Sequence, residues 1–480
     1  MAPSFYWHDY ETWGSDPRWD RPAQFAGQRT DLELNPVGAP LVVYCRPGDD
    51  RLPDPTACLI TGITPWRAAR DGIIEARFAD AIHQELARPG TCGVGYNSLR
   101  FDDEVTRHLF YRNLIDPYGR EWRHQNSRWD LIDALRLAHA LRPDGVAWPT
   151  DDEGVCSFRL EALTAANGIE HGDAHEALAD VRATIALAAR LKRCQPRLFD
   201  YALSLRDKRR VQRMLAMGRP LLHVSARYPA ALGCLAPVLP IAPHPTNGNG
   251  TLVYDLRWDP AEFLDLSLDE ISARLFTPAI ERPEGAVRVP VKTVHSNRCP
   301  MLAPMTTLTP EAAVRWAIDL EQVASHARAL QGSSAAGFRQ RVAEAFGTKA
   351  AVTERDPERM LYSGGFFSDA DRRELDRLRG LPPLELARES PRFEDPRLPE
   401  MLLRYRARNW PETLTDDERA DWDAYRFACL TDPPPGGLAF DQYRQRLLEL
   451  RELHAEDPSR CALLDELDQW AEHIMDAGDQ

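Results

Sequence analysis

The sequence predicts an α/β protein: a mixed sheet flanked by helices, followed by a small β domain and an all-α unit. Over the first 195 residues, strand-like stretches give way to alternating strand-like and helical stretches, the pattern of a helix-flanked sheet. Short apolar runs separated by Pro, Gly and Asn then fill the middle of the chain, and charged helical stretches dominate its end. Because 480 residues exceed what one hydrophobic core usually serves, we expect three domains, at 1–195, 196–350 and 351–480.

The elements of the first domain follow from side-chain periodicity. Apolar, aromatic and β-branched residues bounded by turn residues predict strands, and apolar residues recurring at intervals of three and four predict helices. The expected strands are 5–12, 24–31, 40–46 and 91–97. The expected helices are 75–87, 103–113, 128–141, 158–167 and 174–192.

Beyond residue 195 the sequence pattern changes twice. Short strands are expected within "PLLHVSARYP", "APVLPIAPHPTNGNGTLVYDL" and "VRVPVKTVH", with helical additions at 266–275 and 310–345. The stretch 351–359 is expected to be a linker, and the helices after it are interrupted by a loop at 431–437. The middle domain is therefore predicted to be mainly β and the last one helical.

Composition and charge narrow the class of protein. The nine cysteines form no C-x-x-C pair, which disfavours structural zinc and a redox motif. The sequence has no leader and no apolar run of membrane-spanning length, so we expect a soluble, cytoplasmic protein. A net charge of −14 argues against a general nucleic-acid coat but allows a local basic groove.

Two acids lie at the centre of the first predicted strand, "FYWHDYET". Asp9 and Glu11 are two residues apart, so their side chains share one face of the strand. A buried strand tolerates this pair only if a cation neutralises it or if that face is open to water. The chain contains 73 acids, so about 11 acid-x-acid pairs arise by chance, and the pair alone decides nothing.

Two further motifs place acids near helix starts. In "GYNSLRFDDE", Asp102 follows Asn97 and Phe101 where a strand gives way to a helix, and a simple N-terminal cap is the alternative interpretation. In "NGIEHGDAHEALADVRAT", His175 stands five residues before Asp180. Five residues turn by about 140°, so the two side chains do not form a tight ligand pair, but they can flank one centre from different sides.

Taken in order, these motifs resemble those of the DEDD superfamily of 3′→5′ exonucleases in its His-containing branch, because the tyrosine branch would have a tyrosine where Glu176 stands. The similarity to the bacterial exodeoxyribonuclease I family runs over nearly the whole chain, through "HDYETWGSDPRWDRPAQFAGQRTD", "GYNSLRFDDEVTRHLFYRN", "NSRWDLIDALRLAHALRPDG", "LYSGGFFSDADR" and "RYRARNWPETL". It implies a ribonuclease H-like exonuclease domain, an SH3-like β-barrel domain with helices and a helical C-terminal domain.

The resemblance also implies a reaction. Two Mg²⁺ ions, for which Mn²⁺ can substitute, would be held on the scissile phosphate by Asp9, Glu11, Asp102 and Asp180. One ion would activate a water and the other would stabilise the leaving 3′-oxyanion, while His175 would be the general base. The expected activity is processive release of 5′-mononucleotides from the 3′ end of single-stranded DNA, in mismatch repair and recombination.

Cations and aromatic residues that would grip a single strand are interleaved between residues 100 and 142. For any one of them, a solvated helix face or a core position is the alternative. The resemblance implies substrate contacts at Glu11, Thr12, Arg107, Tyr118, Trp122, Arg136 and Arg159, the last of these on the terminal nucleotide's phosphate. It also implies channel contacts at Lys208, Asn249, Asn297, Arg298, Tyr362 and Phe366. The basic run "RDKRRVQR" at 206–213 could equally be a solubilising face.

The family also associates with the acidic C-terminal tail of single-stranded-DNA-binding protein, which calls for arginine and an apolar slot. Arg142 and Tyr201 stand at matching positions. We expect a monomer that does not bind membranes. Two other hypotheses are an RNA-trimming relative, disfavoured by the length of the chain, and a non-catalytic binding protein, disfavoured because no acidic ligand is missing.

Overall fold

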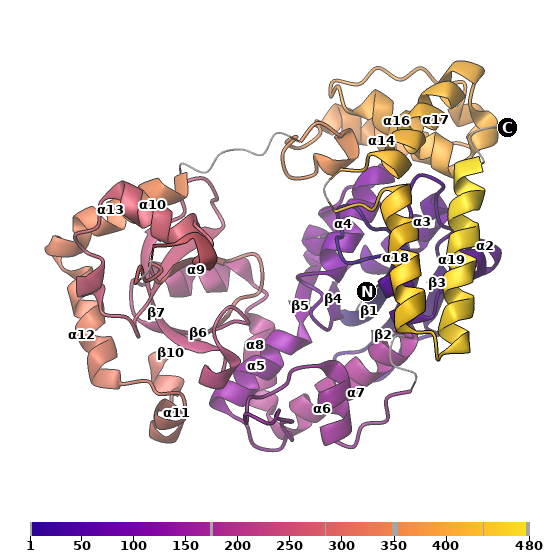
Figure 1. Cartoon of the computed structure of the whole chain (residues 1–480). Coiled ribbons are helices and arrows are strands. Elements are labelled where there is room, and N and C mark those ends of the chain that lie inside the picture. The colour runs from indigo at the N-terminus through magenta and orange to yellow at the C-terminus, as the bar shows by residue number, and fades with distance from the viewer. Residues whose placement is uncertain (1, 173–175, 284, 348–353, 435, 477–480) are drawn as a thin grey trace. The chain divides into compact units, whose positions relative to one another are not determined.

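The computed structural model describes residues 2–172, 176–283, 285–347, 354–434 and 436–476 (Figure 1). The chain divides into two compact units. Unit 1 consists of Met1–Ser127, His171–Arg182 and Val352–Gln480, and unit 2 consists of Arg128–Glu170 and Ala183–Ala351. Two of the crossings between the units fall inside β5 (Ser127–Asp130) and inside α7 (Ala177–Cys194).

Unit 1 is built on a sheet in which β1 (Ser4–Thr12) lies between two partners. It pairs antiparallel with β2 (Pro22–Thr30) and parallel with β4 (Thr91–Gly95), and β3 (Leu41–Tyr44) follows β2. The aromatic composition of β1 suits a strand covered on both faces, and Phe5, Trp7 and Tyr10 are buried. Of the two acids of this strand, Glu11 is buried and Asp9 is partly buried.

Helices cover this sheet, and the C-terminal helices belong to the same unit. Besides the first turn of α7, the helices of unit 1 are α1 (Pro55–Thr61), α2 (Pro65–Asp71), α3 (Glu75–Leu86), α4 (Asp102–Arg112), α14 (Asp369–Arg379), α15 (Pro383–Leu386), α16 (Leu398–Asn409), α17 (Asp416–Thr431), α18 (Phe440–Leu453) and α19 (Pro458–Asp476). α18 and α19 lie side by side (yellow in Figure 1). One hydrophobic core joins Leu52 and Ile63 to Leu447 and Leu464, so the end of the chain supports its beginning.

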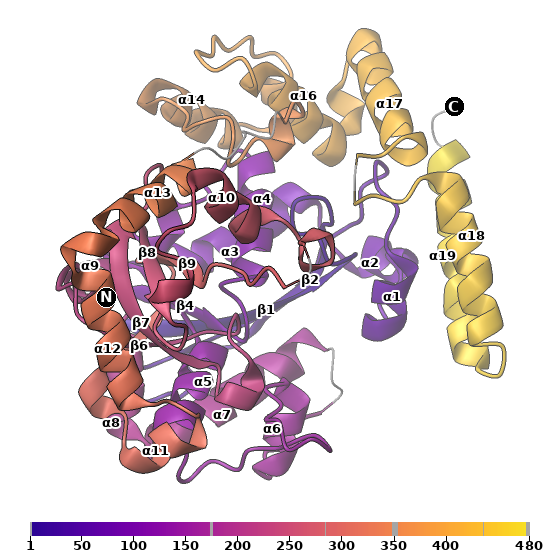
Figure 2. The same cartoon turned by 60° about the vertical axis from the view of Figure 1, so that its left-hand side comes forward.

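Unit 2 contains an antiparallel sheet in the order β10 (Met301–Pro304), β6 (Leu221–Val224), β7 (Leu235–Pro243), β8 (Gly250–Asp255) and β9 (Val291–His295). Its helices are α5 (Leu131–Leu141), α6 (Leu160–Ala166), α8 (Pro196–Ser204), α9 (Lys208–Ala216), α10 (Leu268–Phe276), α11 (Pro310–Arg315), α12 (Leu320–Gln331) and α13 (Ala336–Gly347). α13 contacts both α10 and β7 (Figure 2). The predicted fold class, a mixed α/β sheet accompanied by a small β domain and C-terminal helices, is confirmed.

Several elements differ from the predictions. α1 and α2 lie where the sequence pattern predicts no element, because each is seven residues long and begins at a proline behind a cap, Asp54 or Thr64, which is too short for a periodic signal. β5 occupies residues predicted to begin a helix, because Asp130 caps α5 and sets its first residue at Leu131. The predicted helical region 310–345 divides into three helices.

The predicted start of a helix at residue 174 lies outside the described residues. Within the part of the chain that the structure describes, no helix has both the length and the apolar character needed to cross a bilayer.

Candidate active site

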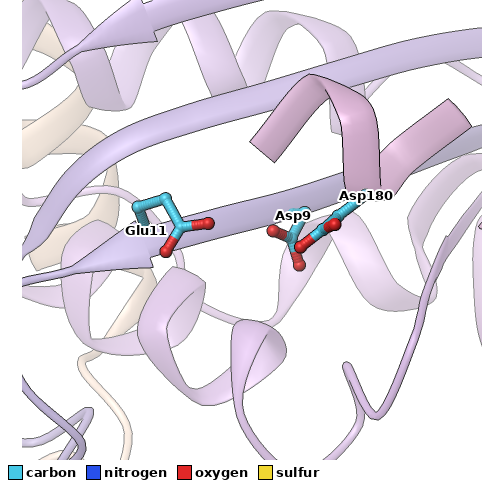
Figure 3. A group of neighbouring side chains, drawn as sticks. All are labelled: Asp9, Glu11 and Asp180. Atoms are coloured by element: carbon cyan, nitrogen blue, oxygen red, sulfur yellow. The ribbon is translucent and has the colours of Figure 1, made fainter. Parts of the chain in front are cut away.

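Three carboxylates from two distant parts of the chain meet in unit 1 (Figure 3). Asp9 and Glu11 lie two residues apart on β1, and Asp180 comes from the first turn of α7. One oxygen of each carboxylate lies within 4.8 Å of the others. In Figure 3, the carboxyl groups of Asp9 and Asp180 lie beside each other, with Glu11 farther along the strand. Such a group of hard oxygen ligands suits a divalent cation.

Asp102 is held against the same strand. It is the first residue of α4 and is 3% exposed. Its Oδ1 accepts a hydrogen bond of 3.2 Å from the backbone N–H of Tyr10, the residue between Asp9 and Glu11. The Thr106 hydroxyl donates to the carbonyl oxygen of Asp102 at 2.8 Å and lies 3.0 Å from the Tyr10 hydroxyl. These bonds fasten α4 to β1 and bring the fourth predicted acid to the strand that carries the first two.

Burial and mutual repulsion raise the pKa values of these acids. Burial raises the pKa of Asp9 well above its usual range, and the neighbouring acids, Asp102 first, raise it further. Burial, followed by the charges of Asp180 and Asp102, raises the pKa of Glu11 to about 8. Burial likewise raises the pKa of Asp102 to about 7. Buried acids that repel one another favour a cation among them.

A histidine that the sequence analysis did not single out touches this group. The Nε2 atom of His171 lies 2.5 Å from Oδ1 of Asp180, and the His171 side chain is 8% exposed. The spacing of residues 171 and 180 matches no motif, so the sequence offers no signal for this contact. His175, the predicted general base, lies outside the described residues.

A buried ion pair involves the second residue of α4. Asp103 and Arg120 form a salt bridge in which both side chains are almost fully buried. Burial, and after it the charge of Arg120, lowers the pKa of His8 to about 4, so this neighbour of Asp9 is neutral near physiological pH. The ion pair fixes the first turn of α4 and with it the position of Asp102.

The cationic substrate contact predicted in unit 1 is buried. Arg107 is 5% exposed, and its guanidinium binds Glu104 at 2.6 Å and Glu121 at 2.7 Å. It also lies 5.5 Å from the centre of the Tyr118 ring and donates to the Tyr362 hydroxyl at 3.1 Å. The E-x-x-R spacing of residues 104 and 107 on a helix is a sequence signal that could have revealed the first pairing.

The other predicted contacts in unit 1 are mostly aromatic and exposed. Trp122, Tyr362 and Phe366 are 65%, 56% and 82% exposed. Phe366 meets the edge of Tyr118 at 5.7 Å between ring centres, and these two residues line a cavity of about 230 Å³. Thr12 is buried, and its hydroxyl donates to a loop carbonyl oxygen two residues on.

The predicted substrate contacts of unit 2 occupy a helix, helix starts and turns. Arg136 of α5 is paired with Asp133 at 2.8 Å and lies 5.4 Å from the Phe158 ring. Arg159 is exposed immediately before α6, and Lys208 is the exposed first residue of α9. The turns next to β8 and β9 carry Asn249, Asn297 and Arg298.

The two residues predicted to bind a protein tail also lie in unit 2. The Arg142 guanidinium donates to the Thr307 carbonyl oxygen at 3.1 Å. The Tyr201 hydroxyl donates to the Leu302 carbonyl oxygen at 2.7 Å, and the Arg210 guanidinium lies 5.3 Å from its ring. Both side chains are therefore fixed by the small sheet and its connections.

Known protein families match the chain along nearly its whole length. The matches are Exonuclease at residues 6–188, Exonuclease I SH3-like domain at 206–348 and Exonuclease I C-terminal domain at 355–474. Exodeoxyribonuclease I of Escherichia coli K12 is 44% identical over 479 residues, which cover 98% of each chain.

Solved structures agree with this match. A moderately thermophilic exonuclease I from Methylocaldum szegediense is 51% identical, with a TM-score of 0.94, over 98% of this chain and 100% of that one. E. coli exonuclease I in complex with a dA16 oligonucleotide is 44% identical, with a TM-score of 0.94 and the same coverage.

Two more structures cover 99% of this chain and 100% of their own. A zinc-bound E. coli ExoI–ssDNA complex is 44% identical with a TM-score of 0.93, and an SSB/exonuclease I structure with an inhibitor is 43% identical with a TM-score of 0.89. The resemblance inferred from the motifs is thus confirmed by identity that extends through all three regions of the sequence. The chain is an exonuclease and belongs to the exodeoxyribonuclease I family.

Proposed function

We propose that this protein removes 5′-mononucleotides from the 3′ end of single-stranded DNA, processively and by metal-dependent hydrolysis. The observation that carries the proposal is the convergence of Asp9, Glu11 and Asp180, whose ligand oxygens lie within 4.8 Å of one another. Asp102, bonded to the same strand, supplies a fourth acid. Family membership supports the reaction class, and the dA16 complex of the E. coli relative supports the substrate.

The four acids fit a site for two divalent cations. They offer only hard oxygen ligands, which Mg²⁺ and Mn²⁺ prefer, and the raised pKa values of three of them indicate a position where positive charge is favourable. When bound, the ions would activate the attacking water and stabilise the leaving 3′-oxyanion. We propose Mg²⁺ as the physiological ion, with Mn²⁺ as a substitute. The zinc-bound E. coli complex supports divalent-cation binding in this family.

The protein's own groups would hold and orient the reactants. Asp9 and Glu11 project from a strand that is paired on both sides, so the backbone that carries them is rigid. Asp180, on α7, is the third acid of the group, and its contact with His171 restricts the rotation of its carboxylate. We propose His175 as the general base that takes the proton of the attacking water, a role suited to an imidazole near neutral pH.

The substrate strand would be held by stacking and by cations. We propose that bases stack on the exposed aromatic residues Trp122, Tyr362 and Phe366. Phosphates would be bound in unit 2 by Arg136, Arg159, Lys208 and Arg298, with Asn249 and Asn297 as polar contacts. Because two carboxylates already bind Arg107, its proposed part is to hold Tyr118 and Tyr362 in place.

The remaining expectations are part of the same proposal. Arg142 and Tyr201 would receive the acidic tail of single-stranded-DNA-binding protein, and the SSB/exonuclease I structure supports such a partner. We propose a cytoplasmic monomer with domains at 1–195, 196–350 and 351–480, acting in mismatch repair and recombination.

The decisive experiment follows nucleotide release from a 3′-labelled single-stranded oligonucleotide, with Mg²⁺ and with EDTA, beside duplex DNA and RNA of the same sequence. Release should depend on Mg²⁺ and should be lost in Asp180→Asn, while circular dichroism shows that the variant is folded. Glu321→Gln, a change at an exposed acid of α12, is the control and should leave release unchanged. Equal rates on duplex DNA or RNA, or full activity in EDTA, would overturn the proposal.

A further inference from the structure

α9 (Lys208–Ala216) has one buried and one strongly cationic side. Val211 and Leu215 are 0% and 4% exposed and anchor the helix on unit 2. The exposed side carries Lys208, Arg209 and Arg213. Positions 209 and 213 are one turn apart, with Cβ atoms about 5–6 Å from each other, so two guanidinium groups project from the same stripe of the helix.

Within the residues that the structure describes, no acidic side chain forms an ion pair with Arg209 or Arg213. The one acid of the run 206–213, Asp207, caps the helix by accepting a 2.8 Å hydrogen bond from the backbone N–H of Arg209. Arg210 differs from both, because it is half-buried against the Tyr201 ring.

Two exposed arginines of α18 differ from this pair, because each lies close to a carboxylate. On α18, Arg444 lies 3.5 Å from Asp468, and Arg446 lies 3.2 Å from Glu449. Arginines with no such partner among the described residues, on a protein of net charge −14, are a surface on which an external polyanion gains attraction that the protein's own acids do not offset.

We propose that the exposed face of α9, through Arg209 and Arg213, binds phosphates of the single-stranded DNA substrate in addition to the contacts described above. The inference rests on the proposed function and adds a second set of DNA contacts, which do not depend on the base sequence. The other exposed residues of this face are Gln212 and Ala216, so the face offers positive charge and little apolar surface. Such a face suits a flexible polyanion. Phosphate binding by arginine releases counterions from the strand, which makes the contribution dependent on salt.

The test is equilibrium binding of the full-length protein to a fluorescent oligothymidylate about 30 nucleotides long, in EDTA so that no cleavage is expected. Arg209→Gln combined with Arg213→Gln should weaken binding about three- to tenfold at about 50 mM salt. The slope of log affinity against log salt should become shallower by roughly 1.4, about 0.7 for each lost phosphate contact on a single strand. The matched control, Arg444→Gln with Arg446→Gln, makes the same change in net charge at side chains that are 48% and 45% exposed and should leave the slope unchanged.

Glutamine is a good helix former, so the thermal unfolding midpoint of the α9 variant should match that of the wild type. If the wild type itself does not bind single-stranded DNA, the proposed function fails. If the wild type binds and the α9 variant binds with the same affinity and salt slope, this inference alone is overturned. It is likewise overturned if the α9 variant keeps its DNA affinity and loses binding to a synthetic acidic peptide ending in phenylalanine, because the face would then serve a protein partner.

Discussion

Asp9, Glu11, Asp102 and Asp180 form a group that opposes folding when no cation is bound, because burial and like charges both raise the free energy of the ionised acids. Proteins keep such groups where activity needs them, and they lose stability in return. The same acids should therefore show opposite effects on stability and on activity when they are replaced.

Glu11→Gln should separate these two effects. Removing one repelling acid should leave the free energy of unfolding in EDTA unchanged or raise it by about 1 kcal/mol. Loss of a ligand should lower exonuclease activity about a hundred- to a thousandfold, the size seen when one electrostatic contact to a transition state is removed. Urea unfolding and nucleotide release measure the two quantities. A destabilised variant with full activity would refute the assignment of Glu11.

Cation binding should be visible in stability as well as in activity. At a Mg²⁺ concentration about 100 times its Kd, the wild type should gain about 2.7 kcal/mol of unfolding free energy. Asp9→Asn should gain much less, because the remaining acids bind the ions more weakly. Thermal unfolding at increasing Mg²⁺ measures the difference, and an equal gain in both proteins would place the ions elsewhere.

The acids of the site could be predicted from the sequence because their chemistry requires them at regular positions on a strand or at the start of a helix. Asp9 and Glu11 follow the two-residue period of β1, and Asp102 opens α4. The contact between His171 and Asp180 comes from a loop that folds back on α7, and no local period encodes it. The pairing of Arg107 with Glu121 is equally non-local, so burial of this predicted DNA contact could not be predicted.

At the scale of elements, α4 is linked to the C-terminal part of unit 1 by a polar network. The Tyr362 hydroxyl donates to Glu104 and accepts a hydrogen bond from Arg107, and the Glu104 and Glu121 side chains are only 17% and 9% exposed. Removing the shared cation would take from these two largely buried carboxylates the guanidinium that both of them bind. The network thus sets the position of an exposed aromatic residue that is proposed to stack on DNA.

Arg107→Met should lower the free energy of unfolding by about 3 kcal/mol, the usual effect of breaking a buried ion pair on one side. Tyr362→Phe removes hydroxyl hydrogen bonds and should lower it by about 1 kcal/mol. Arg123→Met breaks an exposed pair with Asp116, in which the arginine is 43% exposed, and should change stability by less than about 0.5 kcal/mol. Urea unfolding of the three variants tests this order, and similar values for Arg107 and Arg123 would contradict it.

Element types were predictable where the chain shows a long period, whereas the short helices α1 and α2 and the short strand β5 were missed. β1 and α3 match their predicted ranges to within about a residue at each end. β5 is four residues long and is followed directly by the cap Asp130. Its four residues are too few to show a period of their own, so they read as the start of the helix that follows.

At the scale of the whole molecule, buried charges connect helices that are far apart in sequence. Glu75 of α3 accepts from Arg112 of α4 at 3.0 Å and lies 3.8 Å from Arg408 of α16. Burial alone would raise its pKa, but Arg112, Arg21 and Arg408 outweigh burial and lower the pKa to about 2. A carboxyl whose pKa is lower in the folded than in the unfolded protein stabilises the fold above its ordinary pKa, and this stabilisation disappears as the pH falls through the folded value.

Glu75→Gln should therefore be most harmful near neutral pH. It leaves buried arginines without a counter-charge and should lower the free energy of unfolding by about 3–5 kcal/mol. The difference from the wild type should shrink as the pH is lowered from about 4.5 towards 2, because the wild-type carboxyl is protonated there as well. Glu374→Gln, in an exposed pair with Arg377, is the control. Urea unfolding across this pH range tests the trend, and a difference that grows in acid would contradict it.

The hydrophobic core of unit 1 depends on both ends of the chain. Leu52, Ile63 and Ala68 pack in one cluster with Leu447 and Leu464. A chain that lacks residues 354–480 should therefore expose apolar surface, bind a hydrophobic dye and lose cooperative thermal unfolding. Adding the missing segment as a separate polypeptide should reduce dye binding. A truncated chain that unfolds cooperatively at the wild-type temperature would refute this dependence.

Because unit 1 is assembled from the first, a middle and the last segment of the chain, its completion is tied to protein synthesis. Asp9 and Glu11 leave the ribosome before Asp180, and α18 and α19 follow later still. A polypeptide still under translation holds the first two acids without the partners that complete the site and without the core that supports it. We therefore expect DNA cleavage only from chains whose synthesis has passed α19.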